Sequence, residues 1–222
     1  RTGWGQMCDE GAIVFGFTGH GAHAQFMRVP ASTLVPLQDD LSYEVGAAIS
    51  CGTGTAFGAL QRLALQGDET IAVFGQGPVG LSATMLACAM GARVIGVDML
   101  DERLEMSKQF GADAVINARV EDPLEAILEL THGVGTDKSL DCTSSADARL
   151  AAVRCTRKWG SACMVGVGGG LEVDVARDLI FRQVSIIGSW TFSTTGQADC
   201  AKFVAERKLP VAELFTDRWT LE

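Results

Sequence analysis

The alternation of short apolar runs with longer amphipathic stretches constrains the fold of this chain more than any other feature of its sequence. β-Prone runs occupy residues 70–75, 92–98, 112–116, 138–142, 160–167 and 184–190, and segments of helical period occupy residues 78–91, 101–111, 121–133 and 145–157. Strands that alternate with helices are typical of βαβ units, whose parallel strands are covered on both faces and therefore read as continuous apolar runs. The sequence predicts an α/β fold built on a doubly wound parallel sheet.

The segments on either side of this region follow a different pattern. Residues 12–17 and 23–29 are β-prone and flank a glycine-containing turn, so they predict two strands or a hairpin. Two prolines in residues 30–37 then indicate a non-helical crossing, and Ser42 can cap a short helix over residues 43–50. Beyond residue 191, residues 196–209 predict one more helix.

Composition narrows the class of protein. Of the 222 residues, 47% are apolar and 20% are charged, which is the balance of a soluble globular chain with a buried core. The net charge is −9 and there is no basic run, so we expect neither a nucleic acid nor an anionic membrane surface as a partner. No apolar stretch is long enough to span a bilayer.

The cysteines and the first residues bear on location and completeness. Seven scattered cysteines, an odd number with no C-x-x-C pair, indicate reduced thiols in a cytoplasmic protein rather than a disulfide framework or a zinc knuckle. The sequence does not begin with Met, and residues 1–8 have no helix or strand pattern. We therefore expect the chain to be a fragment of a longer protein.

The stretch GQGPVG at residues 75–80 has a glycine pattern that is weak by itself, because the chain holds 26 glycines. Its context strengthens it. Gly75 ends a predicted strand, and Gly77 to Gly80 open a predicted helix in which Pro78 suits the first turn. Free backbone N–H groups at Val79 and its neighbours can bind a pyrophosphate, aided by the helix dipole. The alternative is a glycine turn in another α/β fold, such as a methyltransferase.

An acidic residue completes this pattern. Asp98 ends the next predicted strand, about twenty residues after the loop, which is the spacing of a carboxylate that binds the ribose hydroxyls of a dinucleotide. We therefore predict a Rossmann domain that binds NAD. A carboxylate at Asp98 would repel the 2′-phosphate of NADP, and the nearby Arg103 has the alternative interpretation of a solvated helix charge.

At this point the sequence resembles a known family. Residues 51–60 (CGTGTAFGAL), residues 70–98 and the later VGVGGG at residues 165–170 are similar to the zinc-dependent medium-chain alcohol dehydrogenases. That family joins a GroES-like catalytic domain to a Rossmann domain. The resemblance implies that residues 1–49 are the C-terminal part of the catalytic domain, residues 50–190 the dinucleotide-binding domain, and residues 191–222 a return segment to the catalytic domain.

The resemblance also implies roles for individual residues. Cys51 is similar to a ligand of the catalytic zinc, and it precedes a helix expected to begin near Thr53, where a thiolate is favoured. Its other interpretation is a small buried apolar side chain. Thr55 matches a threonine beside the nicotinamide. The cofactor-binding positions implied by the family are Gly75, Gly77, Pro78, Val79, Gly80, Asp98, Arg103, Val165 and Val167.

Some of the family's residues have no counterpart in the chain. Cys8 looks like the last of four cysteines of a structural zinc lobe, which could form only in the intact protein. The first cysteine ligand and the His-Glu pair of the catalytic zinc are absent, and a zinc site needs about three protein ligands. His20 and His23 are expected to be surface side chains of a turn rather than ligands.

For the intact protein, the resemblance implies oxidation of an alcohol coupled to reduction of NAD, with zinc as the Lewis acid. The alternatives are a zinc-free reductase of the quinone reductase kind and a non-catalytic NAD-binding module. We expect these 222 residues to bind NAD weakly or not at all and to have no dehydrogenase activity. The apolar run at residues 184–190 would lie at a sheet edge, and together with the resemblance it implies a homodimer or homotetramer, unless the C-terminal segment covers that edge.

Overall fold

The computed structural model describes residues 5–220, which divide into two compact units. We call Thr55–Trp190 the sheet unit, and the residues up to Gly54 together with those from Thr191 onward the flanking unit. The assignment of residues 1–49 and 191–222 to a catalytic domain, and of residues 50–190 to a dinucleotide-binding domain, remains a prediction. Among the described residues, no helix has both the length and the apolar character needed to cross a bilayer.

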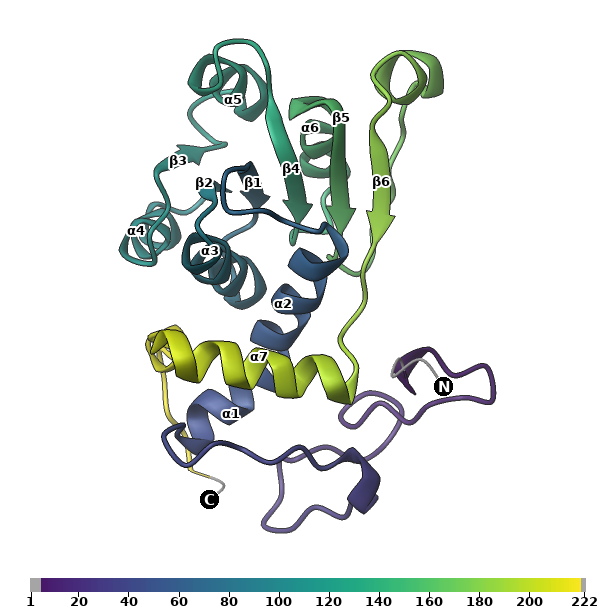
Figure 1. The fold of residues 1–222 in the computed structure, drawn as a ribbon, viewed down its shortest axis with the longest axis vertical. Helices are drawn as coiled ribbons and strands as arrows, with labels where there is room; N and C mark the ends of the chain where they lie inside the picture. The colour runs from purple at the N-terminus through teal and green to yellow at the C-terminus, as the bar shows by residue number, and fades with distance from the viewer. Residues whose placement is uncertain (1–4, 221–222) are drawn as a thin grey trace. The chain divides into compact units, whose positions relative to one another are not determined.

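The sheet unit holds six parallel strands in the order β3-β2-β1-β4-β5-β6 (Figure 1). The strands are β1 (Thr70–Phe74), β2 (Arg93–Asp98), β3 (Ala114–Asn117), β4 (Thr136–Asp141), β5 (Thr156–Met164) and β6 (Ser185–Gly188). The strand order reverses between β1 and β4, which is the topological switch point where ligands bind in open α/β sheets. The predicted doubly wound Rossmann sheet is confirmed.

Helices cover both faces of this sheet. Helices α3 (Pro78–Met90) and α4 (Asp101–Gln109) contact each other and strands β1 to β3, while α5 (Pro123–Leu130) and α6 (Ala146–Cys155) contact each other on the opposite face. The helix ends follow from the local sequence. Pro78 and Pro123 occupy first turns, the Asp122 carboxylate accepts from the N–H of Leu124, and Gly91 ends α3 at φ 98°.

The core is formed by alternate residues of the central strands. The side chains of Ala72, Phe74, Ile95, Val97 and Ile116 pack with residues of α5 and α6. Their neighbours in sequence, such as Ile71 and Val73, point to the other face and are also fully buried. Both faces are therefore dry, which is why these strands read as uninterrupted apolar runs.

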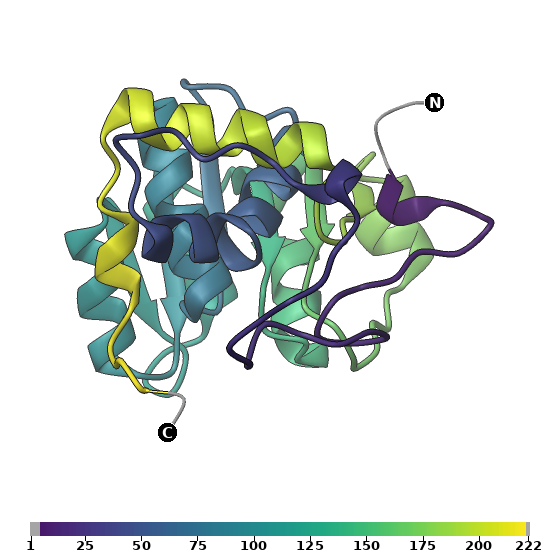
Figure 2. The same cartoon turned by 90° about the horizontal axis from the view of Figure 1, so that it is seen from below.

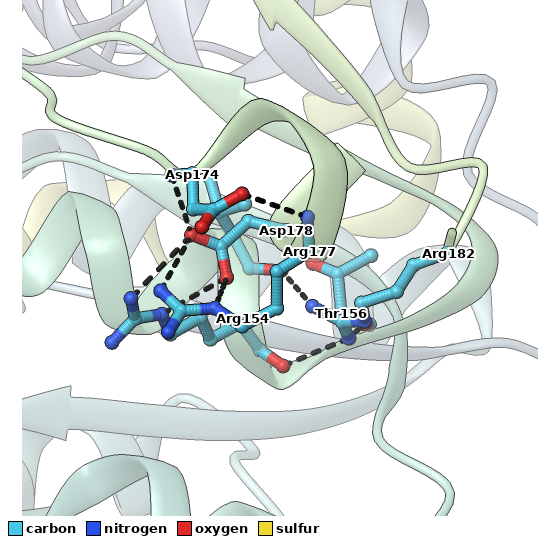
Figure 3. Close-up of polar contacts among 7 residues, drawn as sticks. Arg154, Thr156, Asp174, Arg177, Asp178 and Arg182 are labelled. Carbon is cyan, nitrogen blue, oxygen red and sulfur yellow. Dashed lines mark hydrogen bonds and ion pairs between the residues drawn. The ribbon is translucent and has the colours of Figure 1, made fainter. Parts of the chain in front are cut away.

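The amino edge of the sheet carries a cluster of charges (Figure 3). The buried Asp178 lies in a single-turn π-helical segment, Val175–Ile180, and its carboxylate accepts from Arg154 of α6 and from Arg177. The guanidinium of Arg182 donates to the carbonyls of Val153, Arg154 and Thr156, where α6 ends and β5 begins. These contacts attach residues 174–182 to the end of the sheet unit opposite the carboxyl ends of the strands.

The flanking unit is built on helices. Helix α1 (Tyr43–Ile49) contacts α7 (Thr194–Arg207) and the 3-10 turn Val211–Leu214; two further 3-10 turns lie at Gly5–Met7 and Ala31–Thr33 (Figure 2). The predicted caps form, because the side chain of Ser42 accepts from the N–H of Val45. Helix α2 (Gly52–Arg62) begins next to Cys51 and runs across the division between the units.

The prediction of strands at residues 12–17 and 23–29 is wrong. Within the described part of the flanking unit there is no strand, only an isolated bridge between Phe15 and Gly19. The β structure expected of a catalytic-domain remnant is therefore missing from residues 5–54. A β-prone run becomes a strand only when a neighbouring strand pairs with its backbone, and two strands alone are marginal in water.

Candidate functional site

The three glycines of the loop between β1 and α3 lie in different surroundings. Gly75 adopts φ 84°, a left-handed conformation that side chains avoid. A β-carbon at Gly80 would lie 1.7 Å from the carbonyl oxygen of Gly75, so only glycine lets the helix approach the strand this closely. A β-carbon at Gly77 would meet no atom within 4 Å and would point into open space. The fold needs glycine at Gly75 and Gly80. At Gly77, in contrast, the absence of a side chain leaves open space next to the loop, where a bound group could lie.

This open space faces a helix N-terminus. Gly77 is the N-cap of α3, Pro78 follows in the first turn, and Val79 and Gly80 come next. The first N–H groups of a helix have no partner within it, and the aligned peptide dipoles place partial positive charge there. Together with the space at Gly77, this end of α3 fits a pyrophosphate.

The Asp98 carboxylate lies beside this loop. One oxygen accepts from the backbone N–H of Gln76 at 2.6 Å, and the other accepts from the N–H groups of Met99 and Leu100 at 2.7 and 3.1 Å. The guanidinium of Arg103 lies 3.8 Å from it. Asp98 is only 9% exposed, so its orientation is fixed by the loop itself. The two residues expected on the adenosine side of a cofactor, Asp98 and Arg103, therefore meet at the mouth of the first crossover.

Gln76 fixes the loop from behind and is a residue that sequence reasoning missed. Its side chain is fully buried: the amide nitrogen donates to the carbonyl of Val73 at 2.9 Å, and the amide oxygen accepts from the hydroxyl of Thr84 at 2.9 Å. The signal available in the sequence was a long polar side chain between two glycines, at the end of an apolar strand.

The other predicted cofactor residues lie at the carboxyl end of β5. Val165 is nearly buried, and its N–H donates to the carbonyl of Asp141 at 2.9 Å. Val167 is 78% exposed. Sequence reasoning gave no role to Asp141 or to Arg149, a buried ion pair at this same edge. A charged residue ending an apolar strand was the only available signal.

The predicted metal ligands are not brought together. Cys51 is exposed and directly precedes α2, Cys8 is exposed, and Thr55 is half-buried in α2. Within residues 5–220, no group of three or more His, Cys, Asp or Glu side chains could hold a metal ion. His20 and His23 are exposed, as expected for a turn. The described residues therefore do not fit a zinc ion by themselves, since Cys51 has no second and third ligand among them.

Several thiols of the sheet unit are partly or fully buried, which disfavours their thiolate form. Burial raises the pKa of Cys88 to about 12, with the charge of Asp113 adding to the effect. Burial likewise raises the pKa of Cys163 and of Cys155 to about 12. These thiols stay protonated at neutral pH, and only the thiolate is a good nucleophile or metal ligand.

Comparison with known proteins identifies the family. The family model described as zinc-binding dehydrogenase matches residues 78–207, more than half of the chain. The chain belongs to the zinc-binding dehydrogenase family. This confirms the family resemblance, and the matched region covers the sheet unit from α3 onward and continues through α7.

Individual relatives agree. The chain is 43% identical over 215 residues to the uncharacterized zinc-type alcohol dehydrogenase-like protein YphC of Escherichia coli, covering 96% of the chain and 61% of that protein. It is 32% identical over 194 residues to an alcohol dehydrogenase of Geobacillus stearothermophilus, covering 87% of the chain and 57% of that protein. The chain thus spans about three fifths of the length of these relatives.

Solved structures show the same fold. The alcohol dehydrogenase of Aeropyrum pernix superposes with a TM-score of 0.85 at 28% identity, over 92% of this chain and 60% of that one. An NAD-dependent alcohol dehydrogenase superposes with a TM-score of 0.84 at 29% identity, over 93% of this chain and 61% of that one. The family is therefore one of oxidoreductases of the alcohol dehydrogenase kind.

Proposed function

We propose that the sheet unit binds NAD and that the whole protein transfers a hydride between an alcohol or carbonyl substrate and this cofactor. The observation that carries the proposal is the Asp98 carboxylate, buried and hydrogen-bonded to the backbone of the glycine loop at Gln76. One carboxylate beside one helix N-terminus offers two adjacent sites, one for ribose hydroxyls and one for a pyrophosphate.

Each end of the cofactor has its own residues in the chain. The N–H groups of Val79 and Gly80 would hold the pyrophosphate in the space left by Gly77. Asp98 would accept from the hydroxyls of the adenosine ribose, and Val165 and Val167 would lie near the nicotinamide. When bound, NAD supplies the redox chemistry by accepting a hydride, whereas the protein supplies position and electrostatics.

The geometry favours NAD over NADP. A 2′-phosphate would come next to the Asp98 carboxylate, and like charges in a partly buried site repel. Arg103 does not compensate, because its guanidinium already lies 3.8 Å from Asp98. One of the structural neighbours is an NAD-dependent alcohol dehydrogenase, which supports the same choice.

Zinc belongs to the proposal only for the whole protein. The matching family is described as zinc-binding dehydrogenase, one relative is named a zinc-type alcohol dehydrogenase-like protein, and Cys51 stands where the resemblance implies a ligand. Because residues 5–220 hold no complete ligand set, we expect these 222 residues to show no alcohol oxidation by themselves. Zinc-dependent formation of NADH from any alcohol by this chain would contradict that expectation.

We also propose that the whole protein is a homodimer or homotetramer in the cytoplasm. Strand β6 pairs only with β5 among the described strands, so it is an edge, and three of its four residues are exposed. An exposed strand edge presents backbone groups that a second copy can pair with. Sedimentation of the whole protein would test this, and a monomer at micromolar concentration would contradict it.

The test of cofactor binding is calorimetric titration of the whole protein with NAD and with NADP, because these 222 residues by themselves are expected to bind NAD weakly or not at all. We expect NAD to bind more tightly. Asp98→Ser removes the carboxylate, so NAD affinity should fall by roughly 10- to 100-fold, the range for a hydrogen bond to a charged group. The preference for NAD over NADP should disappear.

Asp101→Ser is the matched control, since it makes the same charge change at the start of α4, where Asp101 accepts from the side chain of Asn117. It should leave the preference intact. Equal binding of NAD and NADP by the unsubstituted whole protein, or no change in Asp98→Ser, would contradict the proposal.

A further inference from the structure

Asp141 occupies the topological switch point of the sheet. It is the last residue of β4, it pairs in register with Phe74 of β1 and with Met164 of β5, and it is fully buried. One carboxylate oxygen accepts from both the N–H and the hydroxyl of Thr143, at 2.9 and 2.6 Å. The other accepts from Nε of Arg149 at 3.1 Å. The carboxylate therefore connects the loop after β4 to helix α6.

Arg149 extends this connection to the loop after β5. Its guanidinium, in a residue only 7% exposed, donates to the carbonyl of Gly166 at 2.7 Å and to that of Gly170 at 3.3 Å. The Ser144 hydroxyl adds a third contact by donating to the carbonyl of Val167 at 2.8 Å. The planar fork of arginine suits several acceptors at once, and a lysine ammonium could not reproduce these directions.

The two loops also pack directly against each other. A β-carbon at Gly166 would lie 2.5 Å from the backbone nitrogen of Ser144, and one at Gly169 would lie 2.1 Å from the Ser144 carbonyl oxygen. These contacts fix the position of residues 165–170 relative to the loop after β4. The segment includes the two valines expected near the nicotinamide.

Thr143 transmits the same constraint to the glycine loop. A β-carbon at Gly75 would lie 2.7 Å from the methyl group of Thr143, so this methyl packs closely on the start of the loop. Asp141 fixes Thr143 through two hydrogen bonds. A single buried carboxylate thus contacts two residues that lie against different loops, Thr143 beside Gly75 and Arg149 beside Gly166.

Stability alone does not account for such a pair. Burying two charges costs desolvation that their attraction often fails to repay, and apolar residues of similar size frequently serve a core as well. A different pair shows the contrast. Arg154 and Asp178 lie at the amino edge, remote from the carboxyl ends of the strands, and among the described residues Asp178 otherwise accepts only from Arg177 and from the backbone N–H of Asp174 (Figure 3).

We propose that Asp141 and Arg149 are positioning residues, which hold the loop at residues 165–170 in place for the nicotinamide end of the cofactor. The proposal rests on NAD binding by the sheet unit. In this proposal, Asp141 and Arg149 position the nicotinamide half of the cofactor, whereas Asp98 and the glycine loop bind the adenosine half.

The experiment compares NAD with ADP-ribose, which keeps the adenosine and pyrophosphate but lacks the nicotinamide. Arg149→Met should weaken NAD by about tenfold, the scale of one lost polar contact, while ADP-ribose binding stays unchanged. If the unpaired Asp141 carboxylate prevents folding, the double variant Asp141→Asn with Arg149→Met removes both charges. The same change in the ratio of the two affinities is expected for it.

Arg154→Met is the matched control, because it breaks a comparable ion pair on the same helix. It should lower stability and leave the ratio of NAD to ADP-ribose affinity as it is. Hydrogen exchange gives a second measurement: backbone amides of residues 166–170 should exchange faster in the Arg149 variants, and those of residues 79–81 should not.

Two results would overturn the proposal: a folded Arg149 variant with an unchanged affinity ratio, or an unsubstituted whole protein that binds NAD no more tightly than ADP-ribose. A whole protein that binds neither ligand would instead refute the proposed function, so the two failures are distinct.

Discussion

The two units of this chain contain similar apolar side chains and bury them very differently. In the sheet unit, Phe74 and Ile95 are at most 1% exposed. In the flanking unit, Phe17, Phe26 and Tyr43 are 88%, 90% and 92% exposed. A β-prone composition is therefore not sufficient to form a strand. Residues 70–74 gain a parallel neighbour on each side, whereas residues 12–17 have no partner strand among the described residues.

The largest loss of stability is expected from a substitution at the closest backbone contact of the glycine loop. Gly80→Ala would place a methyl group 1.7 Å from the carbonyl oxygen of Gly75, where backbone atoms cannot give way. We expect a loss of about 4 kcal/mol or more, which belongs to the exceptional class of substitutions. The measurement is chemical denaturation followed by circular dichroism.

Gly77→Ala is its matched control, because it makes the same substitution three residues away in the same loop. It meets no atom within 4 Å, and φ −76° suits alanine, so stability should be unchanged. NAD binding should still weaken, because the methyl group takes up the space proposed for the pyrophosphate. A stable Gly80→Ala variant would show that the loop adopts another conformation in solution.

The sheet unit was predictable from sequence because its signals are local. Strand and helix periods, Pro78 and Pro123 in first turns, and the glycine loop each occupy a few consecutive residues, and the structure places these elements within a few residues of prediction. The segment at Val175–Ile180 has no such signal. Its one-turn π-helix depends on Asp178 meeting Arg154, which comes from another element.

Some residues of the candidate site could likewise be predicted from the sequence, and others could not. Gly75, Gly80 and Asp98 stand at a spacing that can be read from the sequence, and the structure places them at one mouth. Arg149 reads as a solvated helix charge, because its contacts with Gly166 and Asp141 lie 17 and 8 residues away. Sequence periodicity carries no information on such tertiary hydrogen bonds. Cys51 was predicted as a zinc ligand from the resemblance and from its place before a helix, and no described residue completes its site.

A second prediction concerns acid stability and the charge cluster in the sheet unit. The hydrogen bond from Arg177 lowers the pKa of Asp178, burial opposes the change, and a further hydrogen bond from Arg154 lowers it again. A carboxylate whose folded pKa lies below its unfolded value contributes stability that is present above the unfolded pKa and is lost as pH falls towards the folded one. The contribution should therefore be constant from pH 7 to about 5 and decline below about 4.

Asp178→Asn cannot titrate, so it separates this carboxylate from all others. At pH 7 it should cost about 3 kcal/mol, at the lower end for a buried pair because Arg177 remains 62% exposed at its side chain. The difference in melting temperature between the two proteins should shrink as the pH is lowered from 5 to 3. A difference that stays constant with pH would show that Asp178 is held by packing rather than by its charge.

The smallest expected effect is in the flanking unit, and it tests directly the difference in burial between the two units. Phe17→Ser and Phe26→Ser remove large apolar side chains that are almost fully exposed, so unfolding free energies should change by no more than about 0.5 kcal/mol, as at other surface positions. Phe74→Ser, at 1% exposure, is the matched control and should cost more than about 3 kcal/mol. Thermal unfolding of the three variants measures this. If either flanking variant were destabilised like the control, residues 12–29 would pack in solution, and the contrast between the two units would fail at its origin.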